Sequence, residues 1–237
     1  MALSPKAGRR TPGGRVPHDV TAAVAVTDEQ RRLVAMATSL LLDYPDEAEV
    51  PGLLDTVDAQ LPLLPGAIAD QLASFTTHAR ALGARGLTEH YVETFDQKRR
   101  CSLFLSYYTA GDTRQRGTAI LAFRQALEQL GFEELTDELP DHLTVILEAI
   151  ARSEGRVHEE TVELLAAHRD GIEVLRSALQ NLGSPFSHVV VAVAMAMPEI
   201  DEDTANSYID LIRSGPPAEM VGINATLPFP SAQPDLL

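Results

Sequence analysis

The sequence predicts an all-α protein, a single multi-helix bundle with flexible ends. Hydrophobic residues make up 45% of the 237 positions, aromatic residues only 5%, and tryptophan is absent, so the core must be aliphatic and rich in alanine. Apolar residues recur at intervals of three and four, which places them on one face of a helix. No run alternates with period two, and no Asn-Gly or Asp-Gly pair joins two β-branched stretches, so strand signals are nearly absent.

Caps and prolines set the expected helix boundaries in the first third of the chain. Thr27 or Asp28 can accept backbone N–H bonds at the start of a helix, and the Tyr44-Pro45 pair ends it. Glycines at 83 and 86 end a later helix, and a further helix begins near Thr88. The expected helices in this part span 27–42, 51–61 and 66–82.

A helix, a turn and a second helix are expected between residues 91 and 130. Apolar and aromatic residues recur at helical intervals from Tyr91 to Tyr108, and Gly111 can end this helix because glycine readily takes a left-handed conformation. Asp112 is suited to cap the next helix, about 113–130, which Gly131 stops. The stripe expected to be buried on that second helix is Ile120, Leu121, Phe123, Leu127 and Leu130.

Helices continue through the C-terminal half. Pro140 stands where a helix to about residue 153 begins, and Leu143, Ile146, Leu147 and Ile150 form its apolar stripe. The run from 189 to 197 is apolar throughout but is about half as long as a membrane span, so it is expected to be a fully buried helix. The remaining helices are expected at 156–167, 169–182, 185–197 and 204–212, with breaks near Gly155, Gly171 and Gly183.

The two ends differ from the helical part in composition. Residues 1–26 hold four basic residues against one acidic residue, with scattered Pro and Gly, which predicts a flexible basic tail. The Arg9-Arg10 pair there lacks the apolar run that a twin-arginine signal needs. Residues 215–237 contain five prolines and are expected to be a disordered tail. The helical domain is therefore expected to span residues 27–214.

Net charge and cysteine content narrow the partners and the compartment. The formal charge is −15, and because the basic tail contributes +3, the remainder carries −18. Such a surface repels nucleic acid and attracts a basic peptide. Cys101 is the single cysteine, so an intramolecular disulfide is impossible and a reducing cytoplasm is the expected compartment. No apolar run is long enough to span a membrane.

The sequence offers little for catalysis. It contains no GxGxxG, GxxxxGK[ST], GxSxG or HExxH pattern. The seven histidines are scattered and are expected at the surface or at helix ends. Cys101 is expected to be a small buried residue, and one cysteine cannot build the usual thiolate site for zinc or an iron–sulfur cluster. We therefore assign no catalytic, cofactor or metal residue and predict that the chain is not an enzyme.

Charged residues stand beside aromatic residues in two blocks, 91–117 and 138–148. Seven charged residues fall between positions 96 and 116. Because arginine makes planar bidentate bonds to carboxylates, Asp96 and Asp112 could each hold an arginine and fix the angle between two helices. For any one arginine the alternative is a solvated charged face. The candidates for a structural role are Arg99, Gly111, Asp112, Arg114, Arg116, Gly117, Leu139, Pro140 and Asp141.

These blocks resemble the NarJ family, the chaperones for the molybdenum-cofactor subunit of respiratory nitrate reductase, often called its delta subunit. The resemblance rests on LLDYPD (41–46), YVETFD (91–96), RR.SL.L.YY (99–108), GDTR.RG (111–117) and ELPDHLTVILE (138–148), which together span just under half the chain. It implies an all-helical fold of the molybdoenzyme-chaperone (TorD-like) type.

The resemblance also implies a client, the N-terminal segment of the nitrate reductase catalytic (alpha) subunit. The chaperone would keep the apo-subunit competent for molybdenum cofactor insertion and release it before the finished enzyme works at the membrane. The cofactor-insertion machinery is a further implied partner.

A client helix could lie in an apolar groove, an established mode of peptide recognition. Its apolar face would meet aromatic side chains, and its Lys or Arg residues would pair with acids. The same aromatic stripe could instead be core, as such stripes on helices often are. The candidate client-binding residues are Tyr91, Glu93, Phe95, Asp96, Leu103, Tyr107, Tyr108 and Glu148.

Two alternatives stand beside this function. A chaperone for the twin-arginine leader of another molybdoenzyme, such as an N- or S-oxide reductase, would share the fold, although the GDTR.RG block resembles NarJ proteins. An enzyme could use Glu93, Asp96, Asp141 and Glu148 as acids or bases. Nothing in the sequence pairs these carboxylates.

Overall fold

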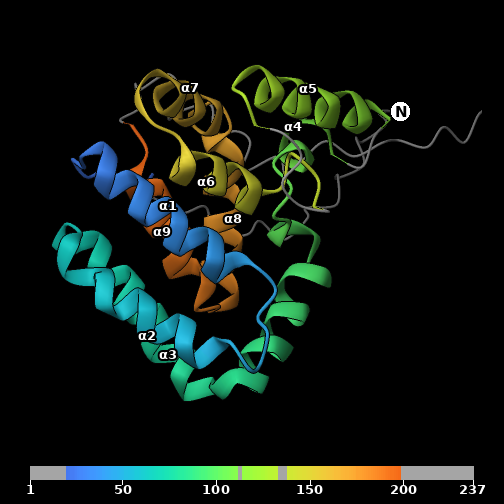
Figure 1. Cartoon of the computed structure of the whole chain (residues 1–237). Coiled ribbons are helices and arrows are strands. Elements are labelled where there is room, and N and C mark those ends of the chain that lie inside the picture. The colour runs from blue at the N-terminus through green and yellow to red at the C-terminus, as the bar shows by residue number, and fades with distance from the viewer. Residues whose placement is uncertain (1–19, 112–113, 133–137, 199–237) are drawn as a thin grey trace, which may run out of the picture.

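The computed structural model describes residues 20–111, 114–132 and 138–198, and within these ranges the chain forms nine α-helices and no strand (Figure 1). The predicted all-α class is confirmed. Residues 1–19 and 199–237 lie outside the described residues, and so does the helix expected at 204–212. Asp112, expected to cap a helix, lies outside them too. The helices are α1 (Asp28–Leu42), α2 (Val50–Gln60), α3 (Gly66–Tyr91), α4 (Ser106–Ala110), α5 (Gln115–Gln129), α6 (Leu143–Arg152), α7 (Gly155–Ala166), α8 (Arg169–Leu182) and α9 (Phe186–Ala196).

Helix α9 forms the centre of the bundle. Its residues Val189, Val190, Ala192 and Ala194 are completely buried, which confirms the prediction of a fully buried helix. Helices α1, α3 and α8 each pack against α9, and α6 packs against α1. Short aliphatic side chains let the helices approach closely without leaving voids. The apolar surface buried in this way is removed from water, which stabilises the bundle.

The predicted cap of α1 is present. The Thr27 hydroxyl accepts a hydrogen bond from the Gln30 backbone, and the Gln30 side chain accepts one from the Thr27 backbone, so two N–H groups at the helix start are satisfied. The apolar stripe predicted for α6 is also confirmed, since all four of its members are buried.

Residues 20–26, which the sequence assigned to the basic tail, pack against α8 and α9 without forming a helix. The Val24 backbone donates to the Met195 carbonyl at 2.8 Å. The Thr21 backbone donates to the Glu173 carboxylate, and Arg169 donates to the Thr21 carbonyl at 2.7 Å. Packed structure therefore begins before the expected boundary at residue 27.

The prediction of one helix from residue 91 to Gly111 is wrong. Helix α3 ends at Tyr91 and is followed by a π-helical turn (Val92–Asp96), a 3-10 turn (Arg99–Cys101) and the short α4. The reason is a competing set of backbone bonds: Leu105 N donates to the Asp141 carbonyl, and Leu143 N donates to the Leu103 carbonyl. These peptide groups find partners across two segments rather than within one helix. Gly111 does end α4, with φ of 59°.

Helix α5 is less buried than its sequence suggested. Of its expected stripe only Phe123 and Leu127 are buried, and Leu121 is 56% exposed. Figure 1 shows the reason, because α5 lies on the side of the bundle opposite α2 and α3 and is covered mainly by α4. Gly131, with φ of 86°, follows the end of α5 as expected.

Two histidines and one ionic cluster are buried. His142 is the N-cap of α6, a helix end as expected, and His158 lies in the first turn of α7; they are 7% and 1% exposed. His158 is held beneath the end of α6, where Nδ1 lies 3.2 Å from the Ile150 carbonyl oxygen. Glu173 is fully buried and accepts a hydrogen bond from the buried Arg176. Burial of these groups depends on tertiary partners that the sequence pattern does not show.

Gly171 lies inside α8, and the break expected near it falls at residues 167–168, between α7 and α8. A Cβ atom at this position would lie 2.9 Å from Tyr108 Cδ2 and 3.0 Å from Tyr108 Cβ and Cγ. The absence of a side chain therefore lets α8 approach the Tyr108 ring. This is a packing requirement, which local helix signals cannot reveal.

We predict that Gly171→Ala lowers the free energy of unfolding by about 1–3 kcal/mol, the usual cost of overpacking a core. Gly52→Ala is the matched control, because Gly52 lies in α2 with nothing within 4 Å of the added Cβ. There alanine should leave stability unchanged or raise it, given its higher helix propensity. Urea unfolding followed by circular dichroism measures both changes. Equal effects at the two positions would contradict the close contact with Tyr108.

Candidate functional site

The two sequence blocks meet through one chain of buried polar contacts. Asp141 is completely buried, and Ser106 at the start of α4 donates a hydrogen bond to Asp141 Oδ2. Arg116 Nε on α5 donates to the Ser106 hydroxyl at 3.3 Å, and the Arg116 guanidinium lies 5.0 Å from the centre of the Phe104 ring. Phe104 in turn packs edge-on against His142. Two of the structural candidates, Arg116 and Asp141, therefore act at one junction.

The other structural candidates are more scattered. Pro140 is buried beside Asp141, whereas Leu139 is 38% exposed. Arg99, Arg114 and Gly117 are exposed. The proposed Asp112 contact cannot be placed, because Asp112 lies outside the described residues.

Three of the aromatic and apolar binding candidates belong to the core. Tyr91, Leu103 and Tyr108 are 7%, 4% and 1% exposed. The Tyr108 hydroxyl donates to the Ser102 carbonyl at 2.8 Å, and the Tyr91 hydroxyl donates to the Leu42 carbonyl at 3.1 Å. Burial raises the pKa of both phenols well above the usual value. These side chains belong to the core and do not line the surface.

An aromatic cluster leads from this core to the surface. The Tyr91 ring lies 4.7 Å from Phe95 and 5.7 Å from Phe186, measured between ring centres. The Tyr44 ring packs edge-on against Tyr91 at 5.6 Å, in a geometry that aromatic pairs favour. Tyr44 is 58% exposed, so it forms the open end of the cluster. Sequence reasoning did not choose Tyr44 as a binding residue, although the LLDYPD match contains it.

A pocket of about 140 Å³ opens beside Tyr44. Leu40, which is 44% exposed, and Leu53 contribute apolar lining. Asp43 and Asp46 stand at the same pocket and are exposed. An apolar side chain flanked by a cation would fit this combination of apolar lining and acidic residues. The lining residues are Leu40, Leu41, Asp43, Tyr44, Pro45, Asp46, Glu49, Val50, Leu53, Leu54, Phe75 and Leu87.

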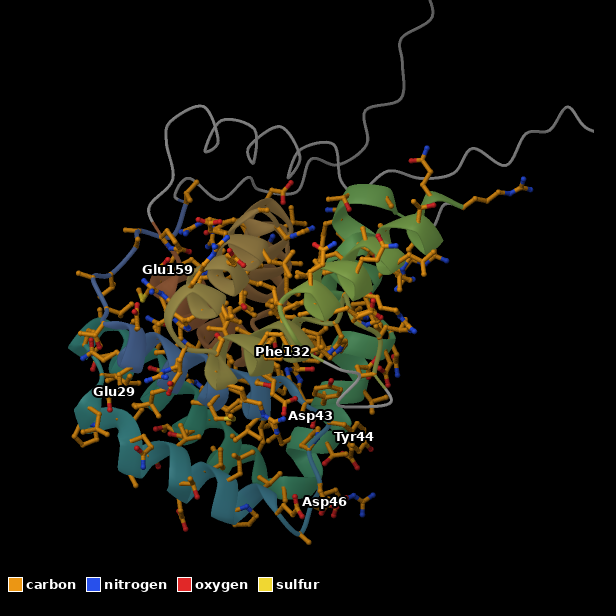
Figure 2. The ribbon with its side chains drawn as sticks, turned by 45° about the horizontal axis from the view of Figure 1, so that its top comes forward. Glu29, Asp43, Tyr44, Asp46, Phe132 and Glu159 are labelled. Atoms are coloured by element: carbon orange, nitrogen blue, oxygen red, sulfur yellow. The ribbon has the colours of Figure 1, made fainter. Side chains whose placement is uncertain are left out.

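Carboxylates from three separate segments act electrostatically on Tyr91, the buried tyrosine of the aromatic cluster. Burial is the main reason that the pKa of Tyr91 is raised. Three carboxylates raise it further: Asp43, which follows α1, Asp96 in the π-helical turn, and Glu138, which precedes α6. Figure 2 shows Asp43, Tyr44 and Asp46 together on one side of the molecule, away from Glu29 and Glu159. We call this surface the acidic aromatic face. It comprises Asp43, Tyr44, Asp46, Phe95, Asp96 and Glu138.

The remaining candidates divide between this face and other surroundings. Glu93 and Asp96 are exposed on the π-helical turn, and Phe95 beside them is half-buried. Tyr107 is half-buried with its ring edge-on to Tyr108. Glu148 forms an ion pair with Arg152 at 2.7 Å along α6. The structure therefore brings together part of the predicted client-binding set.

The environments of the four carboxylates in the enzyme alternative also differ. Asp141 is buried against Ser106, Glu148 is paired with Arg152, and Glu93 and Asp96 are exposed.

Among the described residues, no group of three or more His, Cys, Asp or Glu side chains could hold a metal ion. None of the helices placed by the structure is long and apolar enough to cross a membrane.

The site is thus an apolar pocket beside an exposed tyrosine, with Asp43, Asp46 and Glu49 in its lining, on an all-helical protein. A family model described as "Nitrate reductase delta subunit" matches residues 61–192, which is more than half of the chain. The chain therefore belongs to the nitrate reductase delta subunit family. This finding confirms the resemblance carried by the motif blocks.

Curated relatives agree with this assignment. The chain is 28% identical over 176 residues to the "Probable nitrate reductase molybdenum cofactor assembly chaperone NarJ" of Bacillus subtilis, covering 72% of this chain and 91% of that protein. It is 29% identical over 184 residues to NarJ of Escherichia coli K12, covering 76% of each. These two relatives are named as assembly chaperones and not as enzymes, in agreement with the prediction for this chain.

A third relative is larger. The chain is 35% identical over 161 residues to the "Nitrate reductase-like protein NarX" of Mycobacterium tuberculosis H37Rv, covering 68% of this chain. The matched region is 24% of the length of that protein, so the chain corresponds to about a quarter of it.

We predict that Ser106→Ala lowers the free energy of unfolding by about 1–3 kcal/mol, because it removes a donor from a buried carboxylate. Asp141 Oδ1 has no hydrogen-bond partner among the described residues, so the remaining bond matters more. Ser74→Ala is the control, since that hydroxyl bonds only the Asp70 carbonyl of its own helix, and its effect should stay within about 0.5 kcal/mol. Free energies of unfolding that do not differ between the two variants in chemical denaturation would show that the hydrogen bond from Ser106 to Asp141 does not stabilise the junction.

Stability should also fall on mild acidification. Burial lowers the pKa of His142, against the opposing effect of Glu138, Asp141 and Asp43. Below about pH 6.5, the unfolded chain then binds more protons than the folded chain, so the free energy of unfolding decreases as pH falls. His142→Gln should show a smaller decrease between pH 7.5 and 5.5 than the unmodified protein in urea titrations. An equal decrease in both proteins would show that His142 does not contribute.

Proposed function

We propose that this chain is an assembly chaperone for respiratory nitrate reductase, and that it binds the N-terminal segment of the catalytic subunit. It keeps the apo-subunit competent for molybdenum cofactor insertion. Membership of the delta subunit family and the names of the NarJ relatives support the general role. The observation that carries the binding role is the acidic aromatic face, in which the exposed Tyr44 packs on Tyr91, and carboxylates from three segments raise the pKa of Tyr91.

The face favours a basic, amphipathic helical segment. An apolar side chain of the client enters the pocket beside Leu40 and Tyr44, and the half-buried Phe95 extends the apolar contact. Lys or Arg residues of the client pair with Asp43, Asp46 and Asp96. Exposed aromatic side chains next to pockets commonly dominate binding energy, whereas charges at the rim set specificity and association rate.

One core tyrosine, Tyr91, positions this face. Tyr91 holds the carbonyl of Leu42 through its hydroxyl and contacts the Tyr44 ring through its own ring. Tyr91 thereby fixes the backbone of Leu42 and the side chain of Tyr44, the two residues that flank Asp43. The apolar contact to the client therefore shifts from Tyr91, Leu103 and Tyr108 to Tyr44, Leu40 and Phe95.

The molybdenum cofactor in this proposal belongs to the client. The residues of this chain bind and orient the client segment, and none is assigned to the cofactor. Cys101 is 1% exposed, and burial raises the pKa of its thiol to about 11, so the thiol stays protonated near neutral pH. A cytoplasmic location and a further contact with the cofactor-insertion machinery belong to the same proposal.

We predict that Tyr44→Ala weakens binding of the client peptide at least tenfold, which corresponds to about 1.4 kcal/mol. The peptide covers the N-terminal segment of the nitrate reductase catalytic subunit from the same genome, and calorimetric titration measures its affinity. Leu121→Ala is the control, because Leu121 is equally exposed but lies on α5. Unchanged affinity of a folded Tyr44→Ala variant would exclude the pocket as the client site.

The electrostatic half of the proposal has a charge-matched test. Asp43→Asn with Asp46→Asn should weaken binding and reduce its dependence on salt, because exposed ion pairs are screened. Glu29→Gln with Glu159→Gln removes the same charge far from the face and should change neither. Equal effects of the two double variants would mean that only net charge matters. A twin-arginine leader of another molybdoenzyme that bound as tightly would instead favour the broader client class.

A further inference from the structure

A second surface, the basic groove, lies between residues 97–101 and the second half of α8. Its volume is about 620 Å³. Lys98 and Arg100 are exposed at its rim, and the apolar side chains of Val174 and Leu182 line it from α8. The residues from α8 recur every three or four positions and so share one helix face. The groove is lined by Gln97, Lys98, Arg99, Arg100, Cys101, Val174, Ser177, Ala178, Asn181 and Leu182.

The charge of the groove is opposite to that of the acidic aromatic face. Three consecutive basic residues, 98–100, stand here in a chain whose formal charge is −15. Leu182 is 49% exposed in the same groove. An apolar surface bordered by cations fits an acidic segment that also carries apolar side chains. A basic client segment does not fit it.

Residues 199–213 of this chain have that composition. They contain five acidic side chains, four of them within 199–203, and one basic side chain. In the helix that the sequence predicts at 204–212, Tyr208, Leu211 and Ile212 are spaced to share one face. An acidic stretch followed by an apolar helix face matches the two halves of the groove.

Pro198, the residue before this segment, is held at the start of α8, the helix that lines the groove. Arg169, the first residue of α8, donates to the Pro198 carbonyl at 2.8 Å. Ala178 in the groove lies about 14 Å further along the same helix, at roughly 1.5 Å per residue. Six extended residues span about 20 Å, so residues 199–204 are long enough to reach it. A short tether gives an effective concentration of about millimolar, at which even weak affinity fills a site.

We propose that residues 199–213 occupy the basic groove of the same chain. The acidic residues at 199–203 face Lys98 and Arg100, and the apolar side of 204–212 rests on Val174 and Leu182. An acidic partner segment would have to displace this tail, whereas the acidic aromatic face stays open for the client. This inference does not rest on the proposed client.

Photo-crosslinking of the full chain tests the contact. The photoreactive residue p-benzoylphenylalanine replaces Leu182 in the groove or, as a control, Leu121, which is similarly exposed on α5. Irradiation should join position 182 to residues 199–213 of the same chain, as shown by peptide mapping, and should not join position 121 to them. Crosslinks from 182 only to other residues, or only to a second copy of the chain, would overturn the proposal.

Charge reversal shows whether the contact is specific. Lys98→Glu with Arg100→Glu, or Asp201→Lys with Asp203→Lys, should each reduce the crosslink at least fivefold. The combination of all four substitutions should restore it, because the two sets of charges are exchanged. A yield that does not respond to either reversal would overturn the electrostatic contact.

A binding measurement in trans gives an independent result. A synthetic peptide of residues 199–213 should bind the full chain that carries Asp201→Lys and Asp203→Lys, because the reversed tail leaves the groove open. It should bind the unmodified full chain at least tenfold more weakly, since the tethered tail competes. Absence of binding to the reversed chain would overturn the proposal even if one groove variant failed to fold.

Discussion

The buried hydrogen bond from Ser106 to Asp141 determines the course of the chain through both motif blocks. Burial of a carboxylate costs free energy unless hydrogen-bond donors satisfy its oxygens, and Ser106 supplies such a donor to Asp141. Backbone bonds from Leu105 and Leu143 flank the contact and hold the two segments side by side. Because residues 103–105 run beside 141–143, the chain after Tyr91 cannot continue as a regular helix.

The acidic aromatic face follows from this arrangement. The interrupted helix forms a π-helical turn, which leaves Asp96 exposed and Phe95 half-buried beside the aromatic cluster. The segment that delivers Asp141 also carries Glu138 toward Tyr91. From the other side, Tyr91 fixes the carbonyl of Leu42 and hence the segment that presents Tyr44. Buried contacts thus set the positions of charges that are distant in sequence.

Local signals in the sequence predicted most of the fold. The cap at Thr27, the glycine after α4 and the apolar stripe of α6 act within a few residues, so their outcomes were confirmed. The errors arose where distant segments compete with local preference. The backbone pairing of residues 103–105 replaced an expected helix. Contact with the Tyr108 ring likewise accounts for the glycine at position 171, which no local helix signal reveals.

The candidate site was predicted in part for the same reason. Helical spacing placed Tyr91, Leu103 and Tyr108 on one face but could not show that this face is buried. The acids of the π-helical turn, Glu93 and Asp96, are exposed and stay candidates, whereas Tyr44 was identified only from its contact with Tyr91. The buried Glu173 with its arginines gave no sequence signal, because its partners include the backbone of residue 21.

Hydrogen–deuterium exchange of the full chain, with and without the client peptide, tests the central claim most directly. If the acidic aromatic face binds the client, the peptide will slow amide exchange in residues 43–49 and 92–97. Exchange in α5 and α7 will stay the same, because both helices lie apart from this face. Slowed exchange confined to the basic groove, at 97–101 and 174–182, with no change at 43–49, would contradict the account.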